Sequence, residues 1–446
     1  MMFGDTDFGK AWITTMTQEE RQLRRRKDTQ NAAIVLLIFF FVLVLLVAGV
    51  AAVIKSQLPQ NMASEQQTEE SEVTETEEAT ETESEKVTES APVVDVELEA
   101  AKVFVSGLSL EQKVAQMFMI TPEALTGYNK VTAAGDTTKS FYMEYPVGGM
   151  IYTGNNLIDT EQTKEMLSNT TAFSKEATGL PIFLAVEEEG GTNSPVASNA
   201  SFGAADVGDM SAIGETGEAQ NAYYVGTSIG EYLSALGFNM NLAPVADILT
   251  NEENKALQYR TFGTDGDLVK NMVVAELQGL EEKKVYSVVK TFPGYGTVAG
   301  SSADGLVKTE RNLEELMTGE LIPFRGAIEY GADFIMVGHI AVPAVSGGDI
   351  PSSLSVEMIT NVLRGQLGYK GVVVTEAMNQ KAITDTYSSS EAAVQAIAAG
   401  ADVILMPADF KEAYTGVLEA VGNGTLSEER INESVARIVK VKQQMQ

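Results

Sequence analysis

Charged side chains follow several short apolar runs of this chain, and they are the candidates for chemistry. They are Glu187, Glu188, Glu189, Asp247, Lys290, His339 and Glu376, with Arg260 in the loop after one of the runs. Carboxylates that converge with a lysine, an arginine and a histidine suit a polar, hydroxyl-rich ligand such as a sugar. These groups act together only if the fold brings the ends of the apolar runs to one place.

The composition excludes several other kinds of site. The chain of 446 residues has no cysteine and one histidine, which excludes thiolate metal sites, cysteine nucleophiles and multi-histidine metal sites. It carries 62 acidic and 31 basic residues, whereas phosphate binding needs a concentrated basic face. Its carboxylates lack the spacing of a calcium-binding EF-hand loop. We therefore predict no nucleic-acid partner, no metal site and no cofactor.

The candidate residues lie at the ends of eight apolar runs that alternate with helical patterns. The runs are 117–120, 147–152, 182–186, 240–245, 287–290, 334–339, 371–375 and 403–406. Each run is about as long as a strand, and most of the segments between them are amphipathic, such as 216–236 and 312–330. This alternation predicts an α/β protein with a (β/α)₈ TIM-type barrel. An open doubly wound sheet is the alternative, although no glycine-rich dinucleotide fingerprint follows the first run.

A barrel of this type explains how distant residues form one site. Its parallel strands present their C-terminal ends at the same face, and barrel enzymes carry their reactive groups there. The sequence therefore predicts that Lys290, His339 and Glu376 gather around a single hollow at this rim.

An apolar segment near the N-terminus predicts a membrane anchor. Residues 32–54 contain no charge, and as a helix they would rise about 34 Å, enough to cross a hydrocarbon core of about 30 Å. By the positive-inside rule, the basic residues before the segment place the N-terminus in the cytosol. These are Arg21, Arg24, Arg25, Arg26 and Lys27. A cleaved signal peptide is the alternative, but its apolar region is normally about 7–15 residues long.

Residues 55–98 are rich in serine, threonine, glutamate and glutamine. Such a segment buries too little apolar surface to offset the entropy of ordering, so we predict a disordered linker. The predicted organisation is a cytosolic tail at 1–31, a transmembrane helix at 32–54, this linker, and a barrel domain at 99–446. The sequence thus predicts a single-pass protein of the cell membrane whose C-terminal domain is extracellular.

The most distinctive motif is KTFPGYG at Lys290–Gly296, followed by SSADGL at Ser301–Leu306. FLAVEEEGGTNSP lies before it and VVVTEAM after it. Together these motifs resemble glycoside hydrolase family 3, in particular its single-domain β-N-acetylhexosaminidases, which carry KHFPGHG…DSH…L, a DQEGGRVQR-like run and VVVTDAL. The resemblance covers nearly all of residues 105–443. It implies an amino-sugar glycan, such as a cell-wall fragment, as the ligand.

The resemblance implies roles for individual residues. Glu376 falls on the position of the family's nucleophilic aspartate, and the acid–base pair aligns with Ser301 and Ala303. Asp304, in the same loop, is a substitute candidate for the acid. Substrate-binding positions are implied for Glu187, Arg260, Lys290, His339 and Tyr295. Glu187 replaces a family aspartate, and Tyr295 stands where the family has a histidine.

These substitutions bear directly on catalysis. Retaining hydrolysis needs a nucleophilic carboxylate and, about 5–5.5 Å away, an acid that protonates the leaving oxygen. Glu376 adds one methylene to the nucleophile, and a misplacement of about 1 Å can cost about a hundredfold in rate. Ser301 and Ala303 cannot donate a proton near neutral pH, and the loss of general acid catalysis forfeits about 10²–10⁴ in rate.

Three hypotheses follow for the function. The first is a membrane-anchored, extracytoplasmic protein that acts on or binds an amino-sugar glycan, with its hydrolytic activity weakened or lost. The second is an active retaining glycosidase that uses Glu376 as its nucleophile. The third is a non-catalytic scaffold of a membrane complex, whose protein partners the sequence does not indicate.

Overall fold

The computed structural model of the protein describes residues 95–445. The predicted cytosolic tail, the predicted transmembrane helix 32–54 and the predicted linker up to residue 94 lie outside the described residues. Within 95–445, none of the helices is both long enough and apolar enough to span a lipid bilayer.

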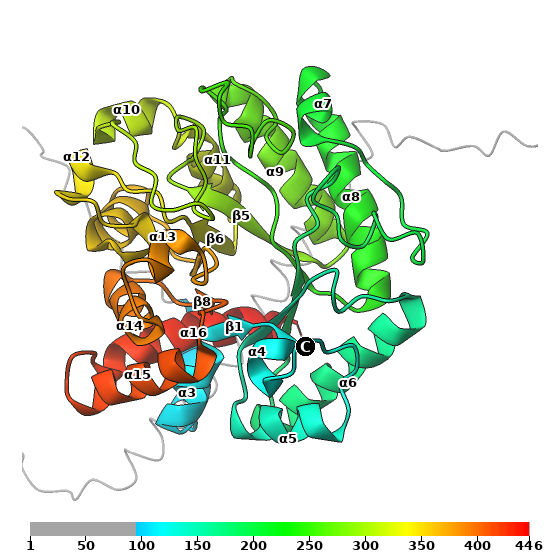
Figure 1. Ribbon diagram of the computed structural model, residues 1–446, viewed down its shortest axis with the longest axis vertical. Helices are drawn as coiled ribbons and strands as arrows, with labels where there is room; N and C mark the ends of the chain where they lie inside the picture. The colour runs from blue at the N-terminus through cyan, green and yellow to red at the C-terminus, as the bar shows by residue number, and fades with distance from the viewer. Residues whose placement is uncertain (1–94, 446) are drawn as a thin grey trace, which may run out of the picture. The chain divides into compact units, whose positions relative to one another are not determined.

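Eight parallel strands form a nearly closed barrel (Figure 1). They are β1 (Phe118–Ile120), β2 (Gly149–Tyr152), β3 (Phe183–Val186), β4 (Met240–Asn241), β5 (Tyr286–Phe292), β6 (Phe334–Val337), β7 (Val372–Thr375) and β8 (Ile404–Leu405). Strands that are consecutive from β1 to β7 pair in parallel, and β1 also pairs with β8, where Phe118 lies opposite Ile404. Each predicted run overlaps one strand. The strand order confirms the predicted (β/α)₈ class and excludes the doubly wound sheet, in which the strand order reverses.

The barrel is closed between β7 and β8 by a narrow seam. The seam contains an isolated bridge between Val374 and Val403, and the Thr375 N–H donates to the Val403 carbonyl at 3.0 Å. Beside it, the buried Asp402 carboxylate accepts a hydrogen bond from the Val373 N–H at 2.9 Å. The same carboxylate pairs with the guanidinium groups of Arg364, Arg430 and Arg437. Burial opposes the ionisation of Asp402, but these cations outweigh it and lower its pKa.

Helices surround the barrel and connect consecutive strands (Figure 1). The longer ones are α5 (Asp136–Glu144), α6 (Thr160–Thr178), α8 (Ala219–Leu236), α9 (Gly266–Glu282), α11 (Ile322–Tyr330), η2 (Glu357–Gln366), α14 (Ser389–Ala399), α15 (Phe410–Gly422) and α16 (Glu428–Gln444). The shorter ones are α3 (Leu110–Gln116), α4 (Pro122–Thr126), α7 (Met210–Glu215), α10 (Leu313–Thr318), α12 (Pro343–Ser346), η1 (Ser352–Leu354) and α13 (Lys381–Thr384). Side-chain caps fix several helix starts: Asp159 accepts from the Gln162 N–H at 2.9 Å before α6, and Asp265 caps α9 in the same way.

The first described helix, α2 (Val96–Val105), begins before the predicted start of the barrel domain at residue 99. Asp95 caps this helix by accepting from the Leu98 N–H at 3.0 Å. The helix packs against α16, and Lys440 of α16 lies 2.7 Å from the Asp95 carboxylate. The last residues of the predicted linker are therefore part of the packed domain.

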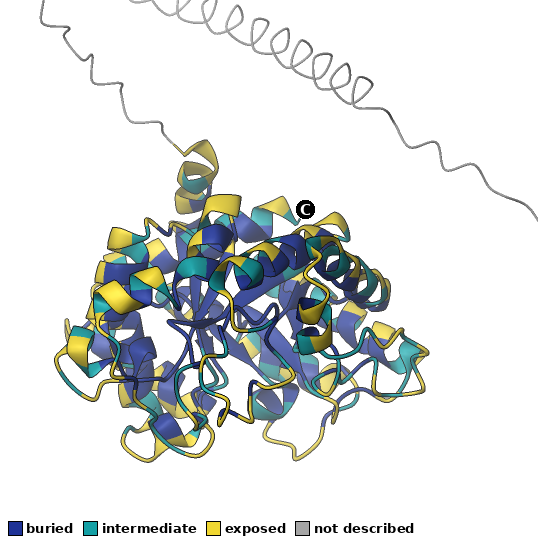
Figure 2. Ribbon diagram, turned by 90° about the horizontal axis from the view of Figure 1, so that it is seen from above, coloured by how far each residue is buried: buried dark blue, intermediate teal, exposed yellow. Residues whose placement is uncertain are grey.

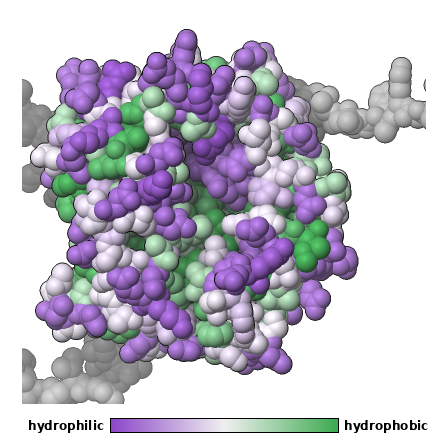
Figure 3. All heavy atoms as spheres, viewed as in Figure 1, coloured by the Kyte–Doolittle hydropathy of each residue, from purple (hydrophilic) through white to green (hydrophobic). Residues whose placement is uncertain are grey.

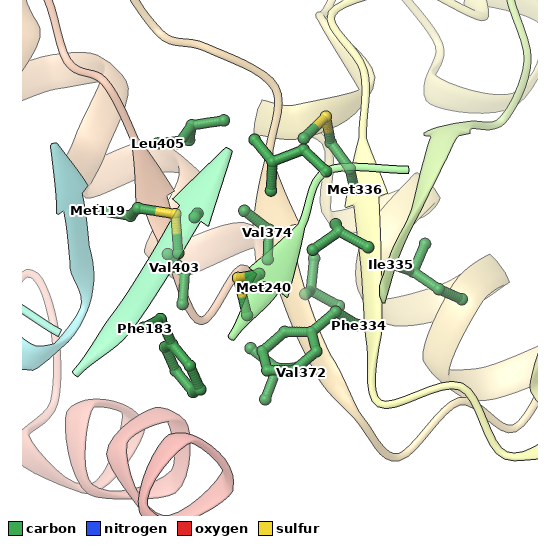
Figure 4. Close-up of a cluster of buried hydrophobic side chains, with 14 of the residues drawn as sticks. Met119, Phe183, Met240, Phe334, Ile335, Met336, Val372, Val374, Val403 and Leu405 are labelled. Carbon is green, nitrogen blue, oxygen red and sulfur yellow. The ribbon is translucent and has the colours of Figure 1, made fainter. Parts of the chain in front are cut away.

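Apolar side chains fill the inside of the barrel. Met119, Phe183, Met240, Phe334 and Val374 come from different strands and lie in one cluster (Figure 4). Phe183 and Phe334 meet edge to face, with their ring centroids 5.3 Å apart. In Figure 2 the strands are buried, while the outer faces of the surrounding helices are exposed. With the interior filled, the rim at the C-terminal ends of the strands is the place where polar side chains collect.

Candidate active site

Four strand ends bring the predicted site residues to one rim of the barrel. Glu187–Glu189 follow β3, Lys290 lies near the end of β5, and His339 and Glu376 follow β6 and β7. Arg260 reaches the same rim from the long segment after β4. On this face of the molecule, polar side chains gather around a smaller apolar area (Figure 3).

Glu189 is the centre of a charged cluster with Lys290, Arg260 and Glu187. The Lys290 Nζ lies 2.5 Å from Glu189 Oε1 and also contacts Glu187 Oε1. Arg260 donates from Nε and Nη2 to the two oxygens of Glu189, both at 2.7 Å. The side chains of Lys290 and Glu189 are only 2% and 1% exposed, whereas that of Glu187 is 43% exposed. The cluster therefore combines a buried ionic core with one half-exposed carboxylate.

The charges of this cluster keep one another ionised. Burial opposes the ionisation of Glu189, but the Lys290 ammonium and the Arg260 guanidinium outweigh it and lower its pKa to about 2. Burial also opposes the protonation of Lys290, and the carboxylates of Glu187 and Glu189 outweigh it and raise its pKa. Glu189, to which the sequence gave no individual role, thus fixes the two cations of the rim. The EEE run is its signal in the sequence, but the run does not show that Glu188 and Glu189 are buried while Glu187 is half-exposed.

Glu376, which the sequence resemblance predicts at the position of the family nucleophile, is held by three neutral donors. The Tyr295 hydroxyl donates to its Oε2 at 2.6 Å, and the Ser302 hydroxyl donates to its Oε1 at 2.5 Å. The backbone N–H of His339 also donates to Oε2, at 3.0 Å. Both carboxylate oxygens therefore have partners within the protein, although Glu376 remains partly exposed.

Tyr295 serves Glu376 as a hydrogen-bond donor and not as an acid. Burial and the neighbouring Glu376 carboxylate raise the pKa of the Tyr295 hydroxyl well above its usual value. The phenol oxygen also accepts a hydrogen bond from the His339 N–H at 2.7 Å. Its ring packs closely over Gly338, where an added Cβ would lie 2.6 Å from a ring carbon. Tyr295 is thus fixed in place, and its contact with a sugar stays a prediction.

The ring of His339 is engaged within the protein. Its Nε2 lies 3.0 Å from the carbonyl oxygen of Ala377, and its Nδ1 lies 2.7 Å from the Ser353 hydroxyl. A carbonyl only accepts, so Nε2 carries the proton and Nδ1 accepts from Ser353. Burial lowers the pKa of the ring, which agrees with a neutral imidazole. The backbone of His339 reaches Glu376, and the implied role of its ring in substrate binding stays a prediction.

Asp247, in the segment after β4, is a further buried carboxylate. Its buried carboxylate accepts from the backbone N–H groups of Thr291 and Tyr295, at 3.2 Å and 2.5 Å. Burial raises the pKa of Asp247 to about 6, although the two N–H groups and Arg260 act in the opposite direction. The negative charge of Glu376 adds to the upward shift. Asp247 therefore holds the KTFPGYG loop and connects Arg260 with Glu376 electrostatically.

The loop predicted to stand in place of the family's acid–base pair, residues 301–304, contains no acid that hydrogen-bonds to Glu376. Ser301 Oγ accepts from the Ala303 N–H at 3.2 Å, and Asp304 is exposed. Among residues 95–445, the Asp304 side chain makes neither a hydrogen bond nor an ion pair within the protein. Ser302, which the sequence did not single out, is the residue of this loop that reaches the carboxylate.

Two further observations concern other kinds of site. Across the part of the chain that the structure describes, no three His, Cys, Asp or Glu side chains are grouped so as to hold a metal ion. A hollow of about 1110 Å³ lies at the opposite end of the barrel, where Asn239, Tyr286 and Asp333 precede or begin their strands. It is separate from the rim that carries Lys290 and Glu376.

A (β/α)₈ barrel whose strand ends carry paired carboxylates and cations defines a broad class of proteins, many of them enzymes. Residues 109–441 match the Glycosyl hydrolase family 3 N terminal domain. Because this match covers most of the chain, the chain belongs to glycoside hydrolase family 3.

Similar proteins include named β-hexosaminidases. Beta-hexosaminidase A of Pseudoalteromonas piscicida is 31% identical over 325 residues, which cover 67% of this chain and 53% of that protein. Beta-hexosaminidase LpqI of Mycobacterium tuberculosis is 30% identical over 271 residues, which cover 59% of this chain and 68% of that protein. The chain spans about half the length of some curated relatives that it matches.

Solved structures show the same likeness. The family 3 β-N-acetylglucosaminidase of Paenibacillus sp. str. FPU-7 aligns with a TM-score of 0.71 and 35% identity, covering 76% of this chain and 62% of that one. The β-N-acetylhexosaminidase of Beutenbergia cavernae aligns with a TM-score of 0.67 and 26% identity, covering 75% of this chain and 99% of that one.

Proposed function

We propose that this protein binds an amino-sugar glycan at the rim of its barrel and that its hydrolytic activity is weakened or lost. Membership of glycoside hydrolase family 3 supports a glycan ligand, as do the β-hexosaminidase names of several relatives. The half-exposed Glu187 and the partly exposed Arg260 of the charged cluster support binding, because charged groups that are already oriented hydrogen-bond strongly to hydroxyls.

The observation that carries the proposal is the environment of Glu376. A carboxylate nucleophile attacks with an oxygen lone pair, and hydrogen bonds from Tyr295, Ser302 and the His339 backbone lower its nucleophilicity. The reaction also needs an acid at the leaving oxygen, worth about 10²–10⁴ in rate. Ser301 and Ala303 occupy the positions of the family's acid–base pair, and neither supplies a proton near neutral pH. Both the attack by the nucleophile and the protonation of the leaving oxygen are therefore impaired.

An active retaining glycosidase is the second candidate function, and the family membership favours it. In this case Glu376 attacks the sugar and Asp304 protonates the leaving group after a movement of its loop. The exposure of Asp304 leaves it free for such a movement.

We also propose that the chain is anchored in a cell membrane by residues 32–54, with the barrel outside the cytosol. The uncharged, apolar character of this segment and the basic residues before it support the proposal. Protease added to intact cells should then digest the barrel but leave the tail before residue 32 protected. A barrel that resists protease until the cells are permeabilised would contradict this orientation.

The test of glycan binding and turnover uses the purified full-length chain. It is incubated with a chromogenic N-acetylglucosaminide and, separately, heated with a mixture of amino-sugar oligosaccharides. We expect no turnover above that of Glu376→Gln, together with thermal stabilisation, since a ligand at 100 times its Kd adds about 2.7 kcal/mol.

The outcomes separate the candidate functions. Turnover that Glu376→Gln abolishes would contradict the loss of activity and support the active glycosidase. If Asp304→Asn abolished it as well, Asp304 would be the acid. No turnover and no stabilisation would contradict glycan binding and leave a non-catalytic scaffold.

A further inference from the structure

His339 contacts the segment of Glu376 twice, once through its ring and once through its backbone. The ring Nε2 donates at 3.0 Å to the carbonyl oxygen of Ala377, the residue directly after Glu376. The backbone N–H donates to Glu376 Oε2, also at 3.0 Å. On the other side of the ring, Nδ1 accepts a hydrogen bond from the Ser353 hydroxyl at 2.7 Å. A chain of hydrogen bonds therefore leads from Ser353 through His339 to the Glu376 segment.

Ser353 has a fixed place relative to this ring. It lies in η1, 14 positions after His339, and its backbone N–H donates to the Gly338 carbonyl at 2.9 Å. Ser352 donates from its N–H and its hydroxyl to the Ile340 carbonyl, at 3.0 and 2.6 Å. The residues on both sides of His339 are thus bonded to η1. His339, Ser352 and Ser353 are all 0% exposed, so water does not compete for these contacts.

The hydroxyl of Ser353 satisfies a need of the imidazole that follows from its single proton. While Nε2 uses this proton toward the Ala377 carbonyl, the lone pair of Nδ1 needs a donor. Burial lowers the pKa of the ring, so a second proton on Nδ1 is disfavoured. Without the hydroxyl, Nδ1 would be a buried acceptor that lacks a partner, which is costly. The ring would then gain by turning away from Ala377 toward another donor.

We propose that Ser353 is a positioning residue for Glu376 and acts through the ring of His339. Its hydroxyl keeps the Nε2 proton on the Ala377 carbonyl. This contact holds the end of β7 beside the end of β6 and so sets the direction of the Glu376 carboxylate. The inference rests on the proposed glycan binding and deepens it, because Ser353 orients the rim although it is itself buried and out of reach of a ligand.

A single isotopic label reports on the whole arrangement. His339 is the only histidine of the 446 residues, so a full-length chain that carries histidine labelled with heavy nitrogen gives magnetic resonance signals from this residue alone. The label reports the two ring nitrogens and the backbone amide that donates to Glu376. We expect a protonated Nε2, a bare Nδ1 and an amide hydrogen that is protected from exchange with water. A proton on Nδ1 at neutral pH would overturn the proposed arrangement, and this measurement needs no variant.

Ser353→Ala should change both the ring and the amide. We expect the two ring nitrogen signals to move toward each other as the ring exchanges between its tautomers. The amide hydrogen of His339 should exchange about fivefold faster, the size expected for one lost neutral hydrogen bond. In isothermal titration calorimetry, the trisaccharide of N-acetylglucosamine should bind about fivefold more weakly. Ser353→Thr keeps the hydroxyl and should restore the ring signals, the amide protection and the affinity.

Ser352→Ala is the matched control. It removes a hydroxyl that is equally buried and lies in the same short helix, but that donates to Ile340. This variant should leave the protonation of His339 and the binding of the trisaccharide unchanged. Glu376→Gln should shift the amide signal of His339 and leave the ring in the same tautomer.

The outcomes separate the role of Ser353 from the proposed function. If Ser353→Ala changes the ring signals but neither the amide nor the affinity, Ser353 merely satisfies a buried ring, and its positioning role is overturned. Equal changes in Ser352→Ala would overturn that role too, because any lost hydroxyl of η1 would then have the same effect. If the unchanged chain does not bind the trisaccharide, the proposed function is overturned, whereas the ring and amide signals still decide the role of Ser353.

Discussion

Glu189 and Glu376 are two carboxylates at the same rim, and they are held in opposite ways. Glu189 is buried and forms ion pairs with two cations, Lys290 and Arg260, which lower its pKa to about 2. Glu376 is partly exposed and accepts hydrogen bonds from two hydroxyls and a backbone N–H. The side of the rim around Glu189 is thus held together by buried ion pairs. The side around Glu376 instead fixes its carboxylate with neutral donors.

This difference between Glu189 and Glu376 predicts that removing a partner lowers the free energy of unfolding by unequal amounts. A buried ion that loses its counter-ion is strongly destabilising, because its desolvation is no longer compensated. A half-exposed carboxylate that loses a neutral donor can accept a hydrogen bond from water instead. Substitutions in the two clusters therefore measure how far they differ.

Glu189→Gln should have the largest effect. It leaves the buried Lys290 with Glu187 alone and removes the bidentate partner of Arg260. We expect the free energy of unfolding to fall by about 3–5 kcal/mol. Denaturant titration at neutral pH measures this change, with Glu419→Gln, an exposed position on the outer helix α15, as the control. A loss as small as that of the control would show that the ion pairs contribute little to stability.

A third carboxylate, Glu276 on α9, extends the comparison because neither an ion-pair partner nor a hydrogen-bond donor contacts it among the described residues. Both of its oxygens are buried without a hydrogen-bond partner among the described residues, and burial raises its pKa to about 8. The unfolded chain releases this proton near pH 4.5, the usual value for a glutamate, so between pH 4.5 and 8 the folded state binds more protons. The contribution of Glu276 to stability therefore falls as the pH rises through this window and is constant above it.

Glu276→Gln should cancel this pH dependence. Relative to the unchanged chain, the variant should gain about 4 kcal/mol of stability as the pH rises from about 5 and reach a plateau near pH 8. Thermal unfolding across this pH range gives the difference directly. A difference that does not change with pH would show that Glu276 is ionised in both states.

Tyr295→Phe should have the smallest effect of the three. It removes one donor from Glu376, while Ser302 and the His339 N–H remain. We expect a loss of about 1 kcal/mol in the free energy of unfolding, measured in the same denaturant titration. A loss as large as that of Glu189→Gln would mean that the Glu376 side of the rim is no less constrained than the ionic one.

The sequence predicted the barrel and the rim but not the contacts within the rim. Eight apolar runs alternating with amphipathic segments determine the strand order, and the strand ends then place Lys290 and Glu376 at one face. Which side chains pair there depends on loops that approach from different strands. Ser302 reaches Glu376 from a loop 74 positions earlier in the chain, and no local pattern encodes that approach.

The sequence also did not show which way a side chain at a strand end points. His339 follows β6 as predicted, yet it turns its ring to Ser353 and Ala377 and offers its backbone N–H to Glu376. The EEE run gave three similar glutamates. Glu187 is half-exposed, whereas Glu188 and Glu189 are both buried and differ in their partners, since Glu188 accepts from the Val196 and Ala197 N–H groups and Glu189 from Arg260.

The seam between β7 and β8 has a consequence for the order of assembly. Asp402 beside it becomes a stable buried ion only when the arginines surround it. Two of these, Arg430 and Arg437, belong to α16, far beyond β8 in the chain. During synthesis we therefore expect the seam to reach its full stability only after this C-terminal helix has been translated and has docked. Until then, β7 and β8 are unprotected edges on which the nascent chain risks pairing with another molecule.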